Sequence, residues 1–318
     1  MQSPANRRKC YPLNQSPFYK LKTRRKLASL FNTTSKNLKK IAKNTDRYYR
    51  VFSKCDAKGK SRTFEVPKPP LNRVHFRLFK LLSRIEPSSY LHSGIKGRSY
   101  ITNAKMHIGC SRMITLDIYK FYPSTLGWHV FEFFHNIMQC SRDVAWLLTS
   151  LCTYNNHVPT GSCISQFIAF FAHYNMFEEI NSIACSLDLT DTCYVDDISI
   201  SGDKANRSTL YKVRGCLKKR GLRSPTKKEH VYDIGYPKSV TGSIVADDGL
   251  RLPNRKHKKI HEEIERLLQT EDTKEKIKLL KTTLGRAIAG SQSDSTLKKR
   301  VVTLTQEKKR IESLLDIQ

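Results

Sequence analysis

Acidic residues are scarce in this 318-residue chain, where 28 Asp and Glu stand against 57 Lys and Arg, a formal net charge of +29. Its nine cysteines are scattered and form no C-x-x-C pair. This pattern argues against both a zinc site and a disulfide framework. Reduced thiols in a cytoplasmic protein are therefore expected. No internal repeat is visible, so a repeat architecture is not expected.

Long apolar runs are also missing. No stretch approaches the roughly 18 residues that span a bilayer, and residues 1–26 lack the apolar centre of a signal peptide. These absences argue against a membrane role. A positive excess this large nevertheless indicates a polyanionic partner, and nucleic acid is the expected one. The length allows one large domain or two ordinary ones.

The first 45 residues contain twelve Lys or Arg and no acid. They fit either a disordered basic tail or an arm along a phosphate backbone. Short helices are predicted near 20–31 and 35–43. The segments "RYYRVF" and "RTFEVP", joined by "AKGK", predict a hairpin, and a helix is predicted at 71–85.

From residue 110 onward, strands and helices are expected to alternate and then give way to charged helices. The predicted elements are a strand ending at Asp117, a helix to about Met138, a helix over 163–184, a hairpin at 196–197, a helix near 204–220, a hairpin over 238–253 and helices over 256–318. This order predicts an α+β core with an appended helical domain.

Two adjacent carboxylates interrupt the strand-like run "CYVDDISIS", residues 193–201. Buried carboxylates are costly unless they are paired or bind a cation. The pair could instead lie at an exposed hairpin tip, as expected for "ADDGLRL", where Asp248 precedes a glycine. No glycine follows Asp197, and apolar residues flank the pair on both sides. That difference favours a partner, and a metal ion is the first candidate.

A third carboxylate, Asp117, ends another apolar strand. If the two strands are neighbours, Asp117, Asp196 and Asp197 converge and repel one another unless divalent cations lie between them. Carboxylate and water ligands indicate Mg²⁺, with Mn²⁺ as a second possibility. Two such ions can clamp the attacking and leaving oxygens of a phosphoryl transfer. In so basic a chain, we expect nucleic-acid synthesis or cleavage.

Seven short motifs within about residues 45–270 resemble those of reverse transcriptases, specifically the bacterial retron reverse transcriptases. They are "KSRTFEVP", "GIKGRSYITNAKMHIG" with its NAxxH element, "LDIYKFYPS", "PTGSCISQ", "YVDD", "GLRSPTKKE" and "SVTG". Each motif alone is a weak signal, but their order and spacing make the resemblance specific.

The resemblance implies the right-hand polymerase fold, with fingers, a ferredoxin-like palm and a helical thumb. It implies a basic N-terminal region over 1–45, interleaved fingers and palm over 46–245, and a helical RNA-binding thumb over 246–318. The implied activity is RNA-directed DNA synthesis from dNTPs with two Mg²⁺ ions.

The same resemblance assigns roles around the carboxylates. Asp117, Asp196 and Asp197 would be the catalytic metal ligands. Lys228 would protonate the pyrophosphate leaving group or balance its charge. Two further residues would contact the nucleotide: Arg62 would hold the triphosphate, and Gly161 lies in a turn that touches template and incoming nucleotide.

Other assignments have an alternative. Tyr122 stands at the position of the steric gate that excludes a 2′-hydroxyl, or it is an ordinary core aromatic. Asn103 and His107 of the NAxxH element are expected to contact RNA, but a core histidine is equally compatible with the sequence. A basic helix start is either an RNA contact or a solvated charged face; its residues are Arg255, Lys256, Lys258 and Lys259.

Four positions depart from the usual family residues. Thr160 replaces Gln, Gln166 replaces Pro, Pro225 replaces Asn, and Val195 replaces the Ala common in retron enzymes. All three carboxylates are present, so an active enzyme is expected.

A retron enzyme implies further partners. A dedicated structured non-coding RNA would be both primer and template, and a guanosine 2′-hydroxyl would start the DNA, giving a branched RNA–DNA hybrid (msDNA). Anti-phage defence with a separate effector or toxin protein is also implied. One alternative is another bacterial, group II intron-like reverse transcriptase, although the chain lacks room for a maturase or endonuclease domain. A second is an RNA–DNA-binding scaffold that holds an effector inactive.

Overall fold

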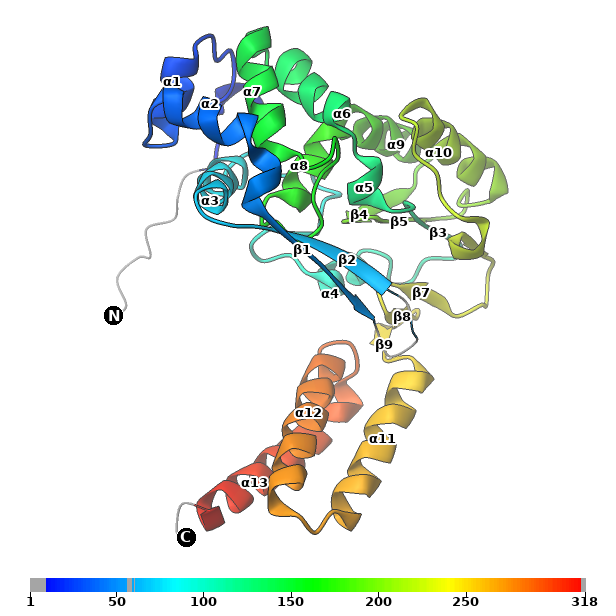
Figure 1. Cartoon of the computed structure of the whole chain (residues 1–318). Helices are drawn as coiled ribbons and strands as arrows, with labels where there is room; N and C mark the ends of the chain where they lie inside the picture. The colour runs from blue at the N-terminus through cyan, green and yellow to red at the C-terminus, as the bar shows by residue number, and fades with distance from the viewer. Residues whose placement is uncertain (1–9, 56–58, 60, 316–318) are drawn as a thin grey trace, which may run out of the picture.

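A four-stranded antiparallel sheet lies at the centre of the molecule (Figure 1). The computed structural model describes residues 10–55, 59 and 61–315, and it mixes helix and strand as the sequence predicts. The sheet has the order β4-β5-β3-β6. Its strands are β3 (Met113–Asp117), β4 (Thr190–Tyr194), β5 (Asp197–Ser201) and β6 (His230–Tyr232).

The two faces of this sheet differ because side chains alternate along each strand. Along β3, Ile114 and Leu116 belong to the main apolar core, so Thr115 and Asp117 point to the other face. β5 alternates in the same way, and Asp117 pairs with Asp197. One face therefore builds the core, and the opposite face is polar and carries carboxylates.

Helices cover the apolar face (Figure 1). They are α5 (Phe121–Ser124), α6 (Gly127–Glu132), α7 (Arg142–Cys152), α8 (Ser165–Ala172), α9 (Tyr174–Ser186) and α10 (Arg207–Lys219), with a π-helical turn at Phe133–Ile137 after α6. The helix predicted over 163–184 is two helices, because the backbone of His173 leaves the helical region at φ −113° and ψ 20°. The helix predicted to end near Met138 is likewise broken, where Thr125 is extended.

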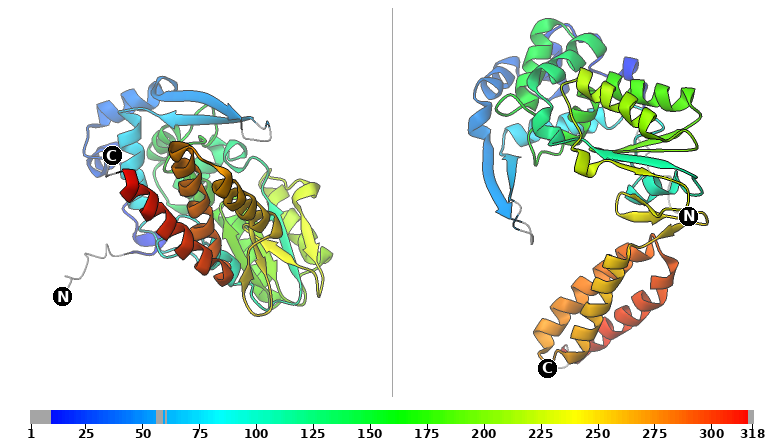
Figure 2. Two further views of the ribbon diagram at one scale, coloured as in Figure 1. Left: turned by 90° about the horizontal axis from the view of Figure 1, so that it is seen from below. Right: turned by 90° about the vertical axis from the view of Figure 1, so that its right-hand side faces the viewer.

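Three N-terminal helices pack beside α7: α1 (Arg24–Leu30), α2 (Ser35–Lys43) and α3 (Leu71–Leu82). The antiparallel hairpin of β1 (Tyr49–Cys55) with β2 (Ser61–Pro67) extends away from them (Figures 1 and 2). Thr23 and Thr34 cap α1 and α2 through side-chain oxygens that accept backbone N–H groups. The predicted hairpin is present, but its turn "AKGK" lies outside the described residues except for Gly59.

Part of the polar sheet face is covered by a second layer that the sequence did not predict in full. It consists of α4 (Tyr100–Lys105) and a three-stranded sheet of β7 (Lys238–Val240), β8 (Ser243–Val245) and β9 (Leu250–Arg251). Ile101 and Ala104 of α4 share an apolar cluster with Val240, Val245 and Met113. Met113 stands on the same face of β3 as Asp117, so this layer lies on the carboxylate face.

Three C-terminal helices form a unit that projects below the sheet (Figures 1 and 2). They are α11 (Asn254–Gln269), α12 (Thr273–Ser291) and α13 (Lys298–Leu315). They enclose their own apolar cluster, which includes Leu267, Leu280 and Leu304. The boundary expected at 245/246 falls inside the β7-β8-β9 sheet, and the helices begin only at Asn254. Among the described helices, none has the length and apolarity needed to cross a membrane.

Candidate active site

Three carboxylates meet at one end of the main sheet. Asp117 is the last residue of β3 and pairs in register with Asp197, the first residue of β5. Asp196 lies in the turn between β4 and β5, where its backbone oxygen accepts the Ile118 N–H at 2.8 Å. One oxygen from each of the three carboxylates lies within 4.8 Å of the others. The convergence expected from the sequence is present.

The cluster carries more negative charge than its surroundings balance. Burial, followed by the charges of Asp196 and Asp117, raises the pKa of Asp197 to about 7, and burial followed by Asp117 raises the pKa of Asp196. The Lys228 ammonium lies 2.6 Å from the nearer Asp117 oxygen and supplies one positive charge. Half-buried, hard oxygen ligands with excess negative charge fit a divalent cation, and these three carboxylates would hold it.

Lys228 reaches the cluster from a short 3-10 turn over Thr226–Lys228. Pro225 precedes this turn with φ −70°, a value that its ring favours, and its carbonyl accepts the Lys228 N–H at 2.8 Å. The departure of Pro225 from the family pattern is therefore compatible with the presentation of Lys228.

Tyr122 lies between the core and the carboxylates. Its ring centre is 6.0 Å from that of Phe121, and it packs against the main apolar core. Burial and then the charge of Asp196 raise the pKa of Tyr122 to about 12. The contact with the core fits the interpretation of Tyr122 as a core aromatic. Its closeness to the carboxylate cluster fits the interpretation as a steric gate.

The β1–β2 hairpin carries a positive charge that acts on the carboxylate cluster. Arg62 is exposed on β2 opposite Lys54, and its positive charge lowers the pKa of Asp196 against the larger effects of burial and Asp117. Gly161 has φ +124°, and a Cβ there would lie 3.2 Å from the Val66 side chain. Only glycine fits this close approach of the 157–162 loop to β2.

Glu65 joins that loop to the hairpin. Its buried carboxylate accepts the Thr160 N–H at 3.0 Å and lies 3.0 Å from Nε2 of His157. Its own N–H donates to the Thr160 carbonyl at 2.6 Å. The threonine that departs from the family pattern thus uses only its backbone in this junction.

Replacing Glu65 with Ala is expected to lower the free energy of unfolding by about 1–3 kcal/mol, because two hydrogen bonds to a buried carboxylate are lost. Urea denaturation of both proteins measures the change. Glu65→Gln is the matched control, since it keeps the acceptor for Thr160 and should cost less. Equal stability of Glu65→Ala and the unchanged protein would contradict this role of the Glu65 side chain.

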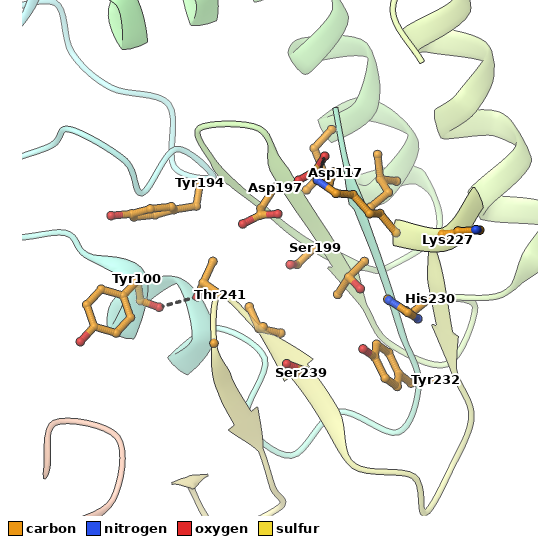
Figure 3. A pocket seen from close by; sticks show the side chains of 16 residues that line it. Tyr100, Asp117, Tyr194, Asp197, Ser199, Lys227, His230, Tyr232, Ser239 and Thr241 are labelled. Atoms are coloured by element: carbon orange, nitrogen blue, oxygen red, sulfur yellow. Dashed lines mark hydrogen bonds and ion pairs between the residues drawn. The ribbon is translucent and has the colours of Figure 1, made fainter. Parts of the chain in front are cut away.

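A cleft of about 700 Å³ opens beside the carboxylates on the polar face (Figure 3). Thr115 of β3 and Ser199 of β5 line it on the sheet face. Tyr100 and Thr241 lie at one side, and His230 and Tyr232 of β6 lie at the other (Figure 3). Thr241 Oγ1 donates to the Tyr100 carbonyl at 2.9 Å. The lining also includes Tyr194, Lys227, Ser239 and Gly242.

Sequence reasoning missed most of this lining. Thr115 stands two residues before Asp117, and Ser199 stands two residues after Asp197. The two-residue period of a strand would have placed both hydroxyls on the carboxylate face. His230 and Tyr232 carried no such signal, because the short strand β6 was not predicted.

The NAxxH residues are not at the surface. Asn103 is fully buried, and neither of its side-chain polar atoms has a hydrogen-bond partner among the described residues. His107 is 1% exposed and lies 2.7 Å from Ser201 Oγ and 2.8 Å from Thr192 Oγ1. Burial lowers the pKa of His107 to about 4. This placement does not support the expected RNA contacts and favours the alternative, an interior histidine.

The basic start of α11 is exposed. Lys256 donates to the Gly242 carbonyl at 2.7 Å, and Lys258 lies 3.8 Å from Glu262. Within the described residues, Arg255 and Lys259 have no acidic partner. Lys256 and Lys259 also line a cavity of about 240 Å³ that borders Tyr100, so this basic helix start lies near one side of the main cleft.

Comparison with known proteins gives relatives of one kind, although no protein-family model matches the chain. The chain is 34% identical over 230 residues to the retron Se72 reverse transcriptase of Salmonella heidelberg (strain 579083-10), a match covering 68% of this chain and 60% of that protein. It is 26% identical over 235 residues to the retron Ec86 reverse transcriptase of Escherichia coli, covering 71% and 72%. The retron Ec48 reverse transcriptase of Escherichia coli is 25% identical over 263 residues, covering 77% and 64%.

The chain thus spans less than two thirds of the Se72 and Ec48 proteins. The matching proteins come from several sources and share one description, which agrees with the motifs around the three carboxylates. By these similarities, the chain belongs to the family of the bacterial retron reverse transcriptases.

Proposed function

We propose that the chain is an RNA-directed DNA polymerase that extends a primer with deoxynucleotides along an RNA template. The observation that carries this proposal is the cluster of Asp117, Asp196 and Asp197 beside a cleft of about 700 Å³, in a chain with net charge +29. A carboxylate cluster suited to divalent cations supports phosphoryl transfer, and the basic surface supports a nucleic-acid substrate.

The architecture fits a right-hand polymerase. The order β4-β5-β3-β6 is that of a ferredoxin-like sheet, and we assign it to the palm. The β1–β2 hairpin and its neighbouring helices would be the fingers, interleaved with the palm over 46–245. The unit α11–α13 would be the thumb, with 246–318 as its expected range, and 1–45 the basic N-terminal region.

Each side chain has a place in the reaction. Two Mg²⁺ ions held by the three carboxylates would stabilise charge on the attacking oxygen and on the pyrophosphate leaving group. Arg62 would bind the triphosphate. Gly161 would let the 157–162 loop approach the triphosphate. Lys228 would move from Asp117 to the pyrophosphate and protonate it or balance its charge. Thr115 and Ser199 would face the primer end in the cleft.

The retron-type reaction is the finer part of the proposal. A structured non-coding RNA would be primer and template, its guanosine 2′-hydroxyl would start the DNA, and the product would be a branched RNA–DNA hybrid. We propose that this product acts in anti-phage defence with a separate effector protein. Nine free cysteines support a reducing compartment such as the cytoplasm.

The test is the nucleic acid that co-purifies with the protein after expression together with the DNA flanking its gene. A branched RNA–DNA molecule, which a debranching enzyme opens into linear strands, is the expected result. Linear cDNA alone would favour the group II intron-like alternative. RNA without DNA, from a protein that also fails to extend an annealed primer, would favour the scaffold and overturn the polymerase.

Replacing Tyr122 with Ala is expected to raise ribonucleotide incorporation, because the aromatic face that would exclude a 2′-hydroxyl is lost. The discrimination should fall by about 1–3 kcal/mol, the scale of selection by pocket shape. The measurement is the ratio of kcat/KM for a deoxynucleotide to that for the matching ribonucleotide. Tyr122→Phe is the control and should keep the ratio, since it keeps the ring. If Tyr122→Ala also keeps it, Tyr122 is only a core aromatic.

A further inference from the structure

The NAxxH residue His107 connects the two strands that flank Asp196. Its ring lies 2.8 Å from Thr192 Oγ1 on β4 and 2.7 Å from Ser201 Oγ on β5. Thr192 and Ser201 stand on the same sheet face as Asp197, because they share its parity in the β4–β5 register. The ring is fully enclosed and makes one hydrogen bond to each strand. Its position therefore limits movement of one strand against the other.

A second contact holds the turn of the same hairpin. The chain at 90–93 runs along the edge of β4, where the Cys193 N–H donates to the Tyr90 carbonyl at 2.8 Å and the His92 N–H donates to the Cys193 carbonyl at 2.9 Å. One step further, the Val195 N–H donates to the buried Ser93 hydroxyl at 3.0 Å.

Val195 needs such a contact. Its φ is +60°, in the left-handed region that β-branched residues rarely occupy. The strain lies directly before Asp196, so the Ser93 hydroxyl holds the backbone of the turn in the conformation that aims this carboxylate. The departure from the family's usual alanine makes the turn more dependent on this bond.

The other end of the same segment reaches the cleft. The Tyr100 carbonyl accepts from Thr241 Oγ1 at 2.9 Å, and both residues lie at one side of the cleft (Figure 3). Ile101 and Ala104 pack on Val240 and Val245. Beyond α4, the Gly109 N–H donates to the Ala246 carbonyl at 3.3 Å. One continuous segment thus contacts the carboxylate-bearing hairpin and the opposing β7–β8 side of the cleft.

We propose that residues 90–107 act as a brace that sets the position of the β4–β5 hairpin relative to the side of the cleft formed by Tyr100 and Thr241. Ser93 and His107 are its positioning residues. Neither contacts the expected substrates, so they act through the placement of Asp196 and Asp197. The catalytic meaning of the brace rests on the polymerase function proposed above, whereas its mechanical role does not.

Three variants separate the contacts. Ser93→Ala removes the hydrogen bond at the turn. His107→Leu removes both bonds between the strands, and His107→Gln can restore one of them. His129→Leu is the matched control, because His129 on α6 is also a buried histidine with two hydrogen bonds, to the Leu126 N–H at 2.9 Å and the Arg220 carbonyl at 3.0 Å.

The first readout needs neither metal nor activity. Amide hydrogen exchange of peptides covering 190–201 should be about tenfold faster in Ser93→Ala, the effect of one lost hydrogen bond on local opening. It should be faster still in His107→Leu, which loses two hydrogen bonds. His107→Gln should lie between His107→Leu and the unchanged protein. His129→Leu should lower the thermal unfolding midpoint without changing exchange in 190–201.

The second readout is divalent cation binding, measured by electron paramagnetic resonance of Mn²⁺. The apparent Kd should rise about tenfold in Ser93→Ala and His107→Leu, because a looser hairpin holds its carboxylates less well in place. In primer extension, the Mg²⁺ concentration that gives the half-maximal rate should rise by a similar factor. The kcat should fall, and the KM for the dNTP should stay unchanged.

Unchanged exchange and Mn²⁺ affinity in Ser93→Ala and His107→Leu would overturn the brace. The same shifts in His129→Leu would also overturn it, because they would mark a general loss of stability. Failure of the proposed function looks different. A protein that extends no primer, yet shows the predicted exchange and Mn²⁺ changes, would refute the polymerase and leave the brace in place.

Discussion

Replacing Asp196 with Asn will abolish DNA synthesis and leave RNA binding nearly intact. The carboxylate lies within 4.8 Å of those of Asp117 and Asp197, and a neutral amide would weaken the divalent site. The loss of rate should reach about 10³-fold or more, equivalent to about 4 kcal/mol of transition-state stabilisation. RNA affinity depends mainly on phosphate contacts with basic residues, so it should change little. Primer extension with Mg²⁺ and filter binding measure the two properties.

The chain contains its own control for this experiment. Asp248 also belongs to an Asp-Asp pair, but it is exposed in the β8–β9 turn and pairs with Arg251 at 2.7 Å. Asp248→Asn removes the same charge and should leave extension unchanged. Asp117→Asn should behave as Asp196→Asn does. Wild-type extension by the Asp196→Asn protein would remove Asp196 from the metal site.

The carboxylate cluster was predictable because its signal is local. Asp117 and Asp197 stand at the ends of apolar strands and Asp196 lies in the adjoining turn, and a carboxylate that is buried in such a place needs a partner. Two strands with the same alternation can then pair so that Asp117 faces Asp197. The placement of Thr115 and Ser199 on the sheet face of the cleft follows from the same alternation, once the carboxylate face is known.

The surroundings of His107 were not predictable in this way. Whether a histidine contacts solvent or the interior depends on which element packs over it, and α4, just before His107, packs on β4 and β8 far away in the sequence. The break at His173 has a similar origin. Residues 167–172 are buried on every side, so the apolar periodicity before the break carries no mark of where the first helix ends. Both features are decided by tertiary packing.

The boundary expected at 245/246 illustrates a third limit. The charge shift after Pro253 marks the start of α11 correctly, but the expected boundary at 246 follows the family resemblance and divides a small sheet. β9 pairs with β8, and this pairing depends on the Asp-Gly turn that the sequence does show. The helical unit α11–α13 is therefore joined to the remainder of the protein through β9, a strand of the β7-β8-β9 sheet beside the cleft.

The second large effect is expected at the basic start of α11. Changing Arg255, Lys256, Lys258 and Lys259 together to Gln should weaken binding of the cognate RNA by about 10²- to 10³-fold at 0.1 M salt, if all four contact phosphates. The slope of log affinity against log salt should flatten by roughly 0.7–0.9 for each lost contact. The structure divides the four: Lys256 bonds to Gly242 and Lys258 lies near Glu262. Arg255 and Lys259 should therefore carry most of the change in slope.

A charge-matched control excludes a general effect of net charge. Lys204, Arg207, Lys212 and Lys218 are exposed on or beside α10, which lies above the sheet in Figure 1 while α11 lies below it. Their quadruple change to Gln should leave RNA affinity and its salt slope nearly unchanged. Extension of a simple annealed RNA–DNA duplex should suffer less from the α11 changes than synthesis on the cognate RNA, because a structured RNA reaches further along the helical unit. Equal losses on both substrates would mean that α11 binds any duplex and does not select the cognate RNA. An unchanged salt slope would place RNA recognition elsewhere. The basic residues of α1 and α2 would then be the next surface to test.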